Sequence, residues 1–193
     1  MIWWFRVRAA PAVLASLLVV LATATLVRTS EVPVPSVVGG LTSGLPLRFL
    51  APLLPVLLLL YGQARADRAM ERVAARGVRW FDPSFAIGMV AIAGAVSVVV
   101  PDGVAVTRNI AGYLGFALLA RWLSTYRLAM ALVSFLPFAV TSSGGHANPA
   151  LWGWPLHDGS SAPALAVATA LFLLGLATYL RPPLRNDTEE TDA

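Results

Sequence analysis

Apolar stretches close to the ~20 residues that span a bilayer recur along this chain, and its ten acidic residues all lie between or beyond them. Charged residues make up only 12% of the 193 positions, against roughly 25% in an ordinary soluble domain. A chain with this pattern cannot hide its apolar residues in one water-soluble core. We therefore predict an all-α fold, a polytopic bundle of transmembrane helices.

The predicted bundle covers residues 1–183 and contains about six spans. These spans cover residues 10–27, 45–61, 83–100, 106–122, 126–140 and 164–180. The fourteen basic residues are all Arg, and alternating spans place only Arg28, Arg48 and Arg108 on the outer side. The positive-inside rule then puts both termini in the cytoplasm, with the chain as a multi-pass protein of the plasma (inner) membrane. The polar, acidic tail at 184–193 is expected to be disordered.

Missing residue types exclude several activities. Without Lys the chain has neither a normal ATP-binding P-loop nor a Schiff-base nucleophile, and without Cys it has no thiol chemistry. The predicted spans contain no Asp, Glu or His, which argues against proton-coupled transport and intramembrane proteolysis. Both histidines, His146 and His157, fall in the outer segment 141–163, too far apart for a short zinc motif. We expect no catalytic site, metal or cofactor in this chain, and no nucleic-acid partner, because no basic patch carries interleaved aromatic residues.

An Arg-rich segment at 63–81 joins the second and third predicted spans on the cytoplasmic side. Its Arg residues recur every three or four positions, which predicts an amphipathic helix with one basic face. That face either contacts anionic lipid headgroups or docks into an acidic groove of a partner protein, and both interpretations fit the spacing. The candidate partner-docking residues are Arg65, Arg68, Glu71, Arg72, Arg76 and Arg79.

The first half of the chain leaves two structural alternatives open. Residues 22–24 resemble a signal-peptide cleavage site, although the run 10–27 is favoured as a retained span. Pro46, Pro52 and Pro55 indicate either a kinked, cavity-lining helix or a bent turn at its start that is buried against neighbours. The preceding segment 28–44 is expected to be an outer loop with a short interfacial helix at most.

Polar and aromatic residues near the outer ends of the spans are expected to face the membrane boundary. Arg48 and Arg108 are predicted to extend toward the headgroups, and Trp152 and Trp154 to form an interfacial belt. Small residues at four-residue spacing, such as Ala111 and Gly115, are expected to let helices of the same bundle pack closely.

The layout of six spans, inner termini, no ATP site and an inner amphipathic helix resembles the membrane half of ABC-2-type bacterial exporters. The phrases at 108–113 (RNIAGY) and 152–156 (WGWPL) also look like those of actinobacterial permease-like proteins, and Arg in place of Lys is typical of high-GC bacteria. In that exporter family a separate ATPase docks on cytoplasmic helices and two membrane halves form the pathway. The resemblance implies that Arg68, Glu71, Arg72 and Arg76 contact such an ATPase.

Three functions follow as hypotheses. The first is the permease-like subunit of an ATP-driven exporter for a hydrophobic or amphipathic small molecule or peptide, working with a separate ATPase and a second membrane subunit. The alternative is a non-transport scaffold or accessory subunit of a larger membrane complex. A lipid-modifying enzyme ranks last, because its acid–base groups, such as His146 and His157, lie only in loops and tail.

Overall fold

The part of the chain that the structure describes is mainly helical, which confirms the predicted helical fold class. The computed structural model describes residues 2–26, 30–34, 43–65, 80–100, 102–142 and 151–181. Its helices are α1 Ile2–Val7, α2 Ala10–Leu26, α3 Leu47–Leu50, α4 Leu53–Ala64, α6 Phe81–Ser97, α7 Gly103–Leu123, α8 Tyr126–Ser142 and α9 Ala162–Ala177, with short 3-10 helices η2 Leu151–Leu156 and η3 Thr178–Leu180. Two strands, β1 Glu31–Val34 and β2 Ser43–Pro46, form one antiparallel pair in which Val32 lies opposite Leu45.

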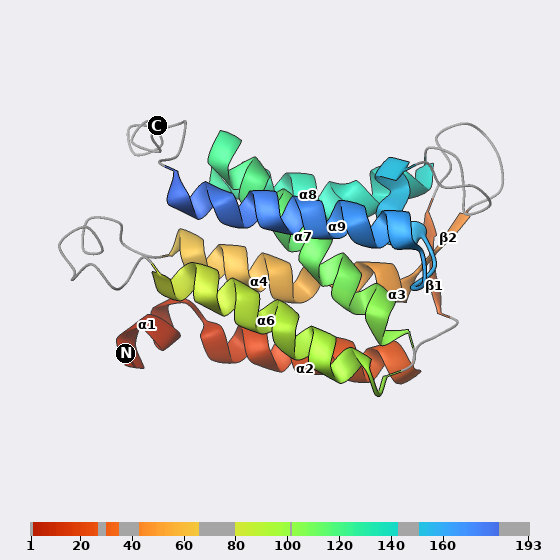
Figure 1. The fold of residues 1–193 in the computed structure, drawn as a ribbon, viewed down its shortest axis with the longest axis horizontal. Helices are drawn as coiled ribbons and strands as arrows, with labels where there is room; N and C mark the ends of the chain where they lie inside the picture. Colours follow the sequence, from red (N-terminus) through yellow and green to blue (C-terminus); the bar gives the residue numbers. More distant parts are fainter. Residues whose placement is uncertain are drawn as a thin grey trace.

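Helix α7 crosses the middle of the bundle, and the other long helices pack around it (Figure 1). Its most extensive contact is with α9, where glycine is required on both sides. A Cβ atom on Gly115 would overlap the backbone of Leu171, and one on Gly175 would overlap the backbone of Gly115. Because neither residue has a side chain, the two helix backbones touch, as predicted for small residues within one bundle.

The space between the helices is filled by apolar side chains. Leu17, Leu60, Met89, Leu114 and Leu118, from four different helices, are each less than 2% exposed. These residues belong to one continuous cluster that joins α2, α4, α6 and α7. The described bundle is therefore held together by a packed apolar centre.

The outer surface of the bundle is apolar as well. Large side chains that point away from the core include Leu18 on α2, Ile92 on α6, Phe135 on α8 and Leu173 on α9, all more than 40% exposed. By length and composition, two helical stretches of the described chain, Leu47–Ala64 and Gly103–Leu123, are able to cross a membrane, and four other apolar helices are shorter.

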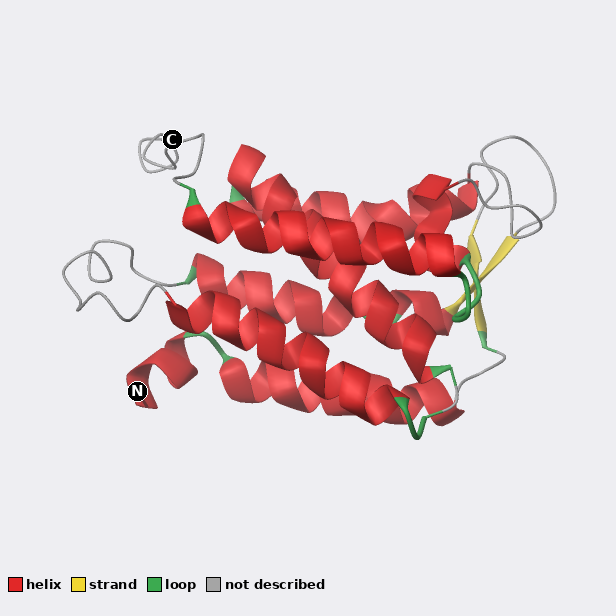
Figure 2. Cartoon of the chain, viewed as in Figure 1, coloured by secondary structure: helices red, strands yellow, loops and turns green. Residues whose placement is uncertain are grey.

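The two ends of the bundle differ in structure and charge. The start of α1, the end of η3 and the α7–α8 turn lie at one end, here called the terminal end (Figure 1). The β1–β2 pair and η2 lie at the opposite end, here called the strand end (Figure 2). Among described residues, the terminal end carries Arg6, Arg8, Arg65, Arg121, Arg127, Arg181 and Asp82, and the strand end carries Arg48, Arg108, Glu31, Asp102 and Asp158.

One local prediction was wrong, and another span differs in detail at its start. The segment 28–44 was expected to hold a short helix at most, but its described parts contribute to the two paired strands. The span predicted at 45–61 begins in β2, continues through the short α3, and turns at Ala51 and Pro52 before α4. Pro52 and Pro55 are buried at the start of α4, where a missing backbone N–H is tolerated. This arrangement agrees with the bent-turn interpretation of the prolines.

The predicted inner helix at 63–81 overlaps the neighbouring helices at both ends. Gln63 and Ala64 belong to α4, and Phe81 is the first residue of α6. Residues 66–79 between them, and the predicted tail at 184–193, lie outside the described residues.

Candidate binding site at the terminal end

One of the predicted docking residues, Arg65, is placed by the structure. It follows the last residue of α4, is exposed, and its guanidinium carbon lies 5.6 Å from the centre of the Tyr61 ring. The other five lie outside the described residues: Arg68, Glu71, Arg72, Arg76 and Arg79. The helix that was predicted to align them is therefore neither supported nor contradicted.

Arg8 joins three helices at the terminal end. It lies in the turn between α1 and α2, where Ala9 adopts a positive φ of 51°, and only 6% of it is exposed. One Nη atom lies 2.6 Å from the Asp82 carboxylate in the first turn of α6, and the other donates to the Gln63 carbonyl at 3.1 Å. The start of α2 is thereby fixed to the end of α4 and the beginning of α6.

Gln63 extends this network toward α7 and the end of α9. Its amide nitrogen donates to the Tyr179 hydroxyl at 2.6 Å, and its amide oxygen accepts from Arg121 at 3.3 Å. Arg121 also donates to the Tyr126 hydroxyl at 3.3 Å, and its guanidinium lies 4.9 Å from the Tyr179 ring centre. Within the described chain, Arg121 has no carboxylate partner. We call Arg8, Gln63, Asp82, Arg121, Tyr126 and Tyr179 the terminal cluster.

Asp82 was missed as a site residue because the third span was predicted to begin after it. The helix starts at Phe81, so the carboxylate lies inside the first turn of α6 and is only 15% exposed. The sequence did contain an indication of this site, because Arg8 is a second charge close to the predicted membrane boundary on the same side as Asp82. A carboxylate and a guanidinium at matching depths are expected to pair when both are removed from water.

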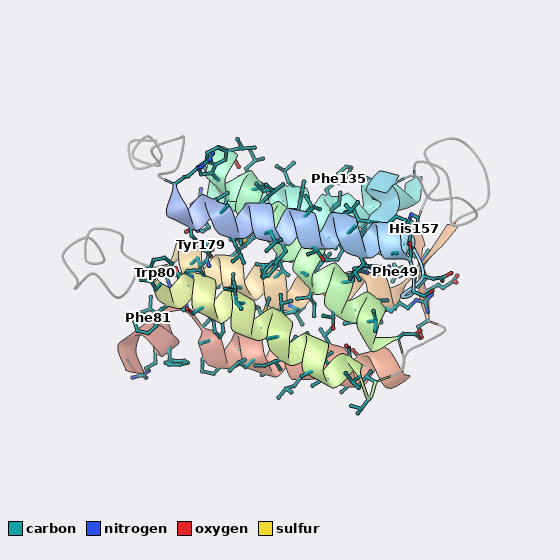
Figure 3. The ribbon with its side chains drawn as sticks, viewed as in Figure 1. Phe49, Trp80, Phe81, Phe135, His157 and Tyr179 are labelled. Atoms are coloured by element: carbon teal, nitrogen blue, oxygen red, sulfur yellow. The ribbon has the colours of Figure 1, made fainter. Side chains whose placement is uncertain are left out.

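An apolar groove lies beside the terminal cluster, between α6 and α9. It has a volume of about 380 Å³, within the range of small-molecule sites. Trp80 and Tyr179 lie at the same end of the bundle (Figure 3), and both line the groove. The lining residues are Trp80, Pro83, Ile87, Leu173, Leu176, Ala177 and Tyr179.

At the strand end, Arg108 does not extend to the headgroups as predicted. It is 1% exposed and donates to the carbonyl oxygens of His157 and Asp158 at 2.7 Å each, and of Pro155 at 3.3 Å. Asn109 donates to the same Pro155 oxygen at 3.1 Å. The segment after η2 folds back over the start of α7, so its carbonyl groups reach Arg108 before lipid or water can.

Trp154 likewise does not belong to an interfacial belt. It is 3% exposed, its ring centre lies 5.2 Å from that of Tyr113, and a Cβ on Gly112 would overlap it. The Trp152 side chain lies outside the description. Arg48, the other residue predicted to extend toward lipid, is 32% exposed and lies 3.7 Å from Asp102.

The histidines form no metal site in the part of the chain that is described. There, no three His, Cys, Asp or Glu residues gather closely enough to hold an ion. His157 Nδ1 lies 3.4 Å from the Ser161 hydroxyl, and His146 falls outside the described ranges.

No known protein family, curated protein or solved structure matches this chain. What the terminal end can do therefore follows from its own chemistry. The terminal cluster offers two guanidinium groups, one carboxylate and two phenols, all joined by hydrogen bonds or ring contacts. With an apolar groove at its side, it is suited to binding an amphipathic partner.

Proposed function

We propose that this chain is a six-span protein of the bacterial inner membrane with its terminal end in the cytoplasm. The apolar outer surface supports this, because exposed Leu18, Ile92, Phe135 and Leu173 are stable in lipid and costly in water. Helices of 17 residues, such as α2 and α6, measure about 25 Å, slightly less than the ~30 Å hydrocarbon layer. Local thinning of the bilayer accommodates that difference. The excess of Arg at the terminal end supports its cytoplasmic side.

Within the membrane, the chain acts as the permease-like subunit of an ATP-driven exporter for a hydrophobic or amphipathic small molecule or peptide. A separate chain supplies the ATPase. The observation that carries this proposal is the way Arg8 fixes both flanks of residues 66–79. It holds Gln63 in the last turn of α4 and Asp82 in the first turn of α6.

The terminal cluster offers a route for mechanical coupling. A partner that moved residues 66–79 would displace the end of α4 and the beginning of α6. Gln63 would pass that displacement to α7 through Arg121 and to η3 through Tyr179. A connection bound only to lipid needs no such link to four helices.

Co-purification tests the proposal. The chain is expected to retain an ATPase in mild detergent, and the double variant Arg72→Glu with Arg76→Glu is expected to release it. Arg127→Glu with Arg181→Glu is the matched control, because both residues are exposed at the same end but lie outside the Arg-rich segment. Retention of the ATPase by the first variant would show that these Arg residues do not dock it.

The packed centre favours one alternative, a scaffold or accessory subunit of a larger membrane complex. The contact between Gly115 and the α9 backbone leaves no space between those helices, and apolar side chains fill the remainder of the described core. Reconstitution separates the two functions. Substrate movement by vesicles that contain only this chain and its ATPase would exclude the scaffold.

A further inference from the structure

The groove between α6 and α9 presents an apolar surface with polar groups at one end. Side chains along its length are Pro83, Ile87, Leu173 and Leu176, none of which forms hydrogen bonds. Its polar lining side chains are Trp80 and Tyr179, and the Tyr179 hydroxyl already accepts from Gln63. An extended peptide would find few partners there for its backbone, whereas a hydrocarbon chain needs none.

An excess of positive charge lies next to the polar end of the groove. Arg8 and Asp82 form an ion pair, but Arg121, whose guanidinium lies 4.9 Å from the centre of the Tyr179 ring, has no carboxylate partner in the described chain. Arg181 follows Tyr179 by two residues and is exposed. A ligand with its polar group near Trp80 and Tyr179 is therefore favoured if that group is anionic.

We propose that this groove binds an anionic phospholipid of the cytoplasmic leaflet. One acyl chain lies along Ile87, Leu173 and Leu176, and the phosphate group lies at the Trp80–Tyr179 end. The inference rests on the proposed membrane location but not on the proposed ATPase. The lipid would lie next to the terminal cluster and would act on Gln63 and Arg121, the residues that join α4 to α7.

Native mass spectrometry of the purified full-length chain tests the site. The protein in detergent is offered equal amounts of phosphatidylglycerol and phosphatidylcholine with identical acyl chains, and the retained lipid is counted. Each basic residue near the headgroup contributes about a factor of five, so Arg121 and Arg181 together are expected to favour phosphatidylglycerol by about 25-fold. The exposed variant Arg181→Gln should reduce this preference about fivefold.

Groove-filling variants locate the bound lipid. Ile87→Trp and Leu173→Trp are expected to remove most phosphatidylglycerol binding, because the larger side chain occupies the groove. Ile92→Trp and Leu174→Trp are matched controls, since these residues have similar exposure on the same helices but do not line the groove. All four residues are more than 40% exposed, so folding is preserved, and gel filtration verifies this for each variant.

Equal retention of the two lipids by the wild-type protein would overturn the proposal. So would a preference for phosphatidylglycerol that the groove-filling variants leave intact, because the lipid would then bind elsewhere. The exporter proposal fails separately. A chain without an ATPase partner can still retain the lipid, and a chain absent from the membrane fraction refutes the membrane location before any lipid is offered.

Discussion

Replacing Arg108 with Met is expected to loosen the strand end and to destabilise the whole bundle. Met preserves much of the volume of the side chain but removes the two short hydrogen bonds to His157 and Asp158 and the longer one to Pro155. A hydrogen bond to a charged group contributes about 1.5–3 kcal/mol, so the two short bonds represent about 3–6 kcal/mol. His157 is half-buried and Asp158 is exposed, so in the variant water can bind to their carbonyl groups and offset part of the lost free energy. The expected loss in free energy of unfolding is therefore about 3 kcal/mol.

Thermal unfolding of the purified chain in detergent measures this loss. For a chain of this size, about 3 kcal/mol corresponds to a fall in melting temperature of about 6–12 °C. Amide hydrogen exchange should accelerate more at residues 156–161 than in α2. Arg48→Met is the control, because Arg48 is 32% exposed and its 3.7 Å ion pair with Asp102 contributes at most about 1 kcal/mol. If R108M and R48M have the same melting temperature, Arg108 does not hold the segment after η2, and the explanation for its burial is wrong.

Three further substitutions test the packing and the terminal cluster, each by thermal unfolding. Gly115→Ala forces α7 away from α9 and is expected to cost about 1–3 kcal/mol. Its control, Gly88→Ala, has open space around the Cβ position and should be neutral or slightly stabilising. Equal effects of the two substitutions would refute the close contact. Asp82→Asn removes the 2.6 Å ion pair of the buried Arg8 and should cost about 3 kcal/mol. Prior mutation of Arg8 to Gln should abolish most of that effect. Tyr113→Phe removes the 3.0 Å hydrogen bond to the Phe49 carbonyl and should cost about 1 kcal/mol, and an unchanged melting temperature would mean that water replaces the hydroxyl.

The positions of the helices were readable from the apolar runs. The run predicted at 10–27 corresponds to α2 Ala10–Leu26, and the run predicted at 106–122 falls within α7 Gly103–Leu123. A long apolar run predicts the position of a helix by itself, because the run depends only on residues that are adjacent in the sequence. The placement of Gly115 against a neighbouring helix was readable for the same reason, although the identity of that helix was not.

The contacts of Arg108 and Trp154 were not readable, because both depend on partners far away in sequence. Arg108 binds carbonyl groups 47 to 50 residues later in the chain. A sequence pattern shows that a charge lies near a membrane boundary, but not that a loop folds back to surround it. For Trp154, the neighbouring Pro155 and Leu156 make the segment apolar, which is compatible with burial in the protein. We interpreted this apolar segment as one that contacts the membrane.

The strand pair and the terminal cluster were missed for a similar reason. Pro33 and Pro46 made strands improbable by local propensity. Both prolines nevertheless lie in the pair, in which β1 and β2 are both edge strands as far as the described residues show. Arg8, Gln63, Asp82 and Arg121 come from four separate parts of the chain. Their convergence follows from the packing order of the helices, which local pattern does not encode.

The central position of α7 has a consequence for the way this protein is synthesised. α7 is less apolar than Leu47–Ala64, the other described stretch that is able to cross a membrane, and it carries Arg108 and Asn109. The carbonyl groups that bind Arg108 belong to residues 155–158, and the helix that covers α7 most extensively, α9, follows them. Those residues leave the ribosome a few seconds after α7 does. During that interval α7 must stay beside α6, to which a short turn connects it, or be sheltered by the insertion machinery. The described bundle closes only when α9 emerges.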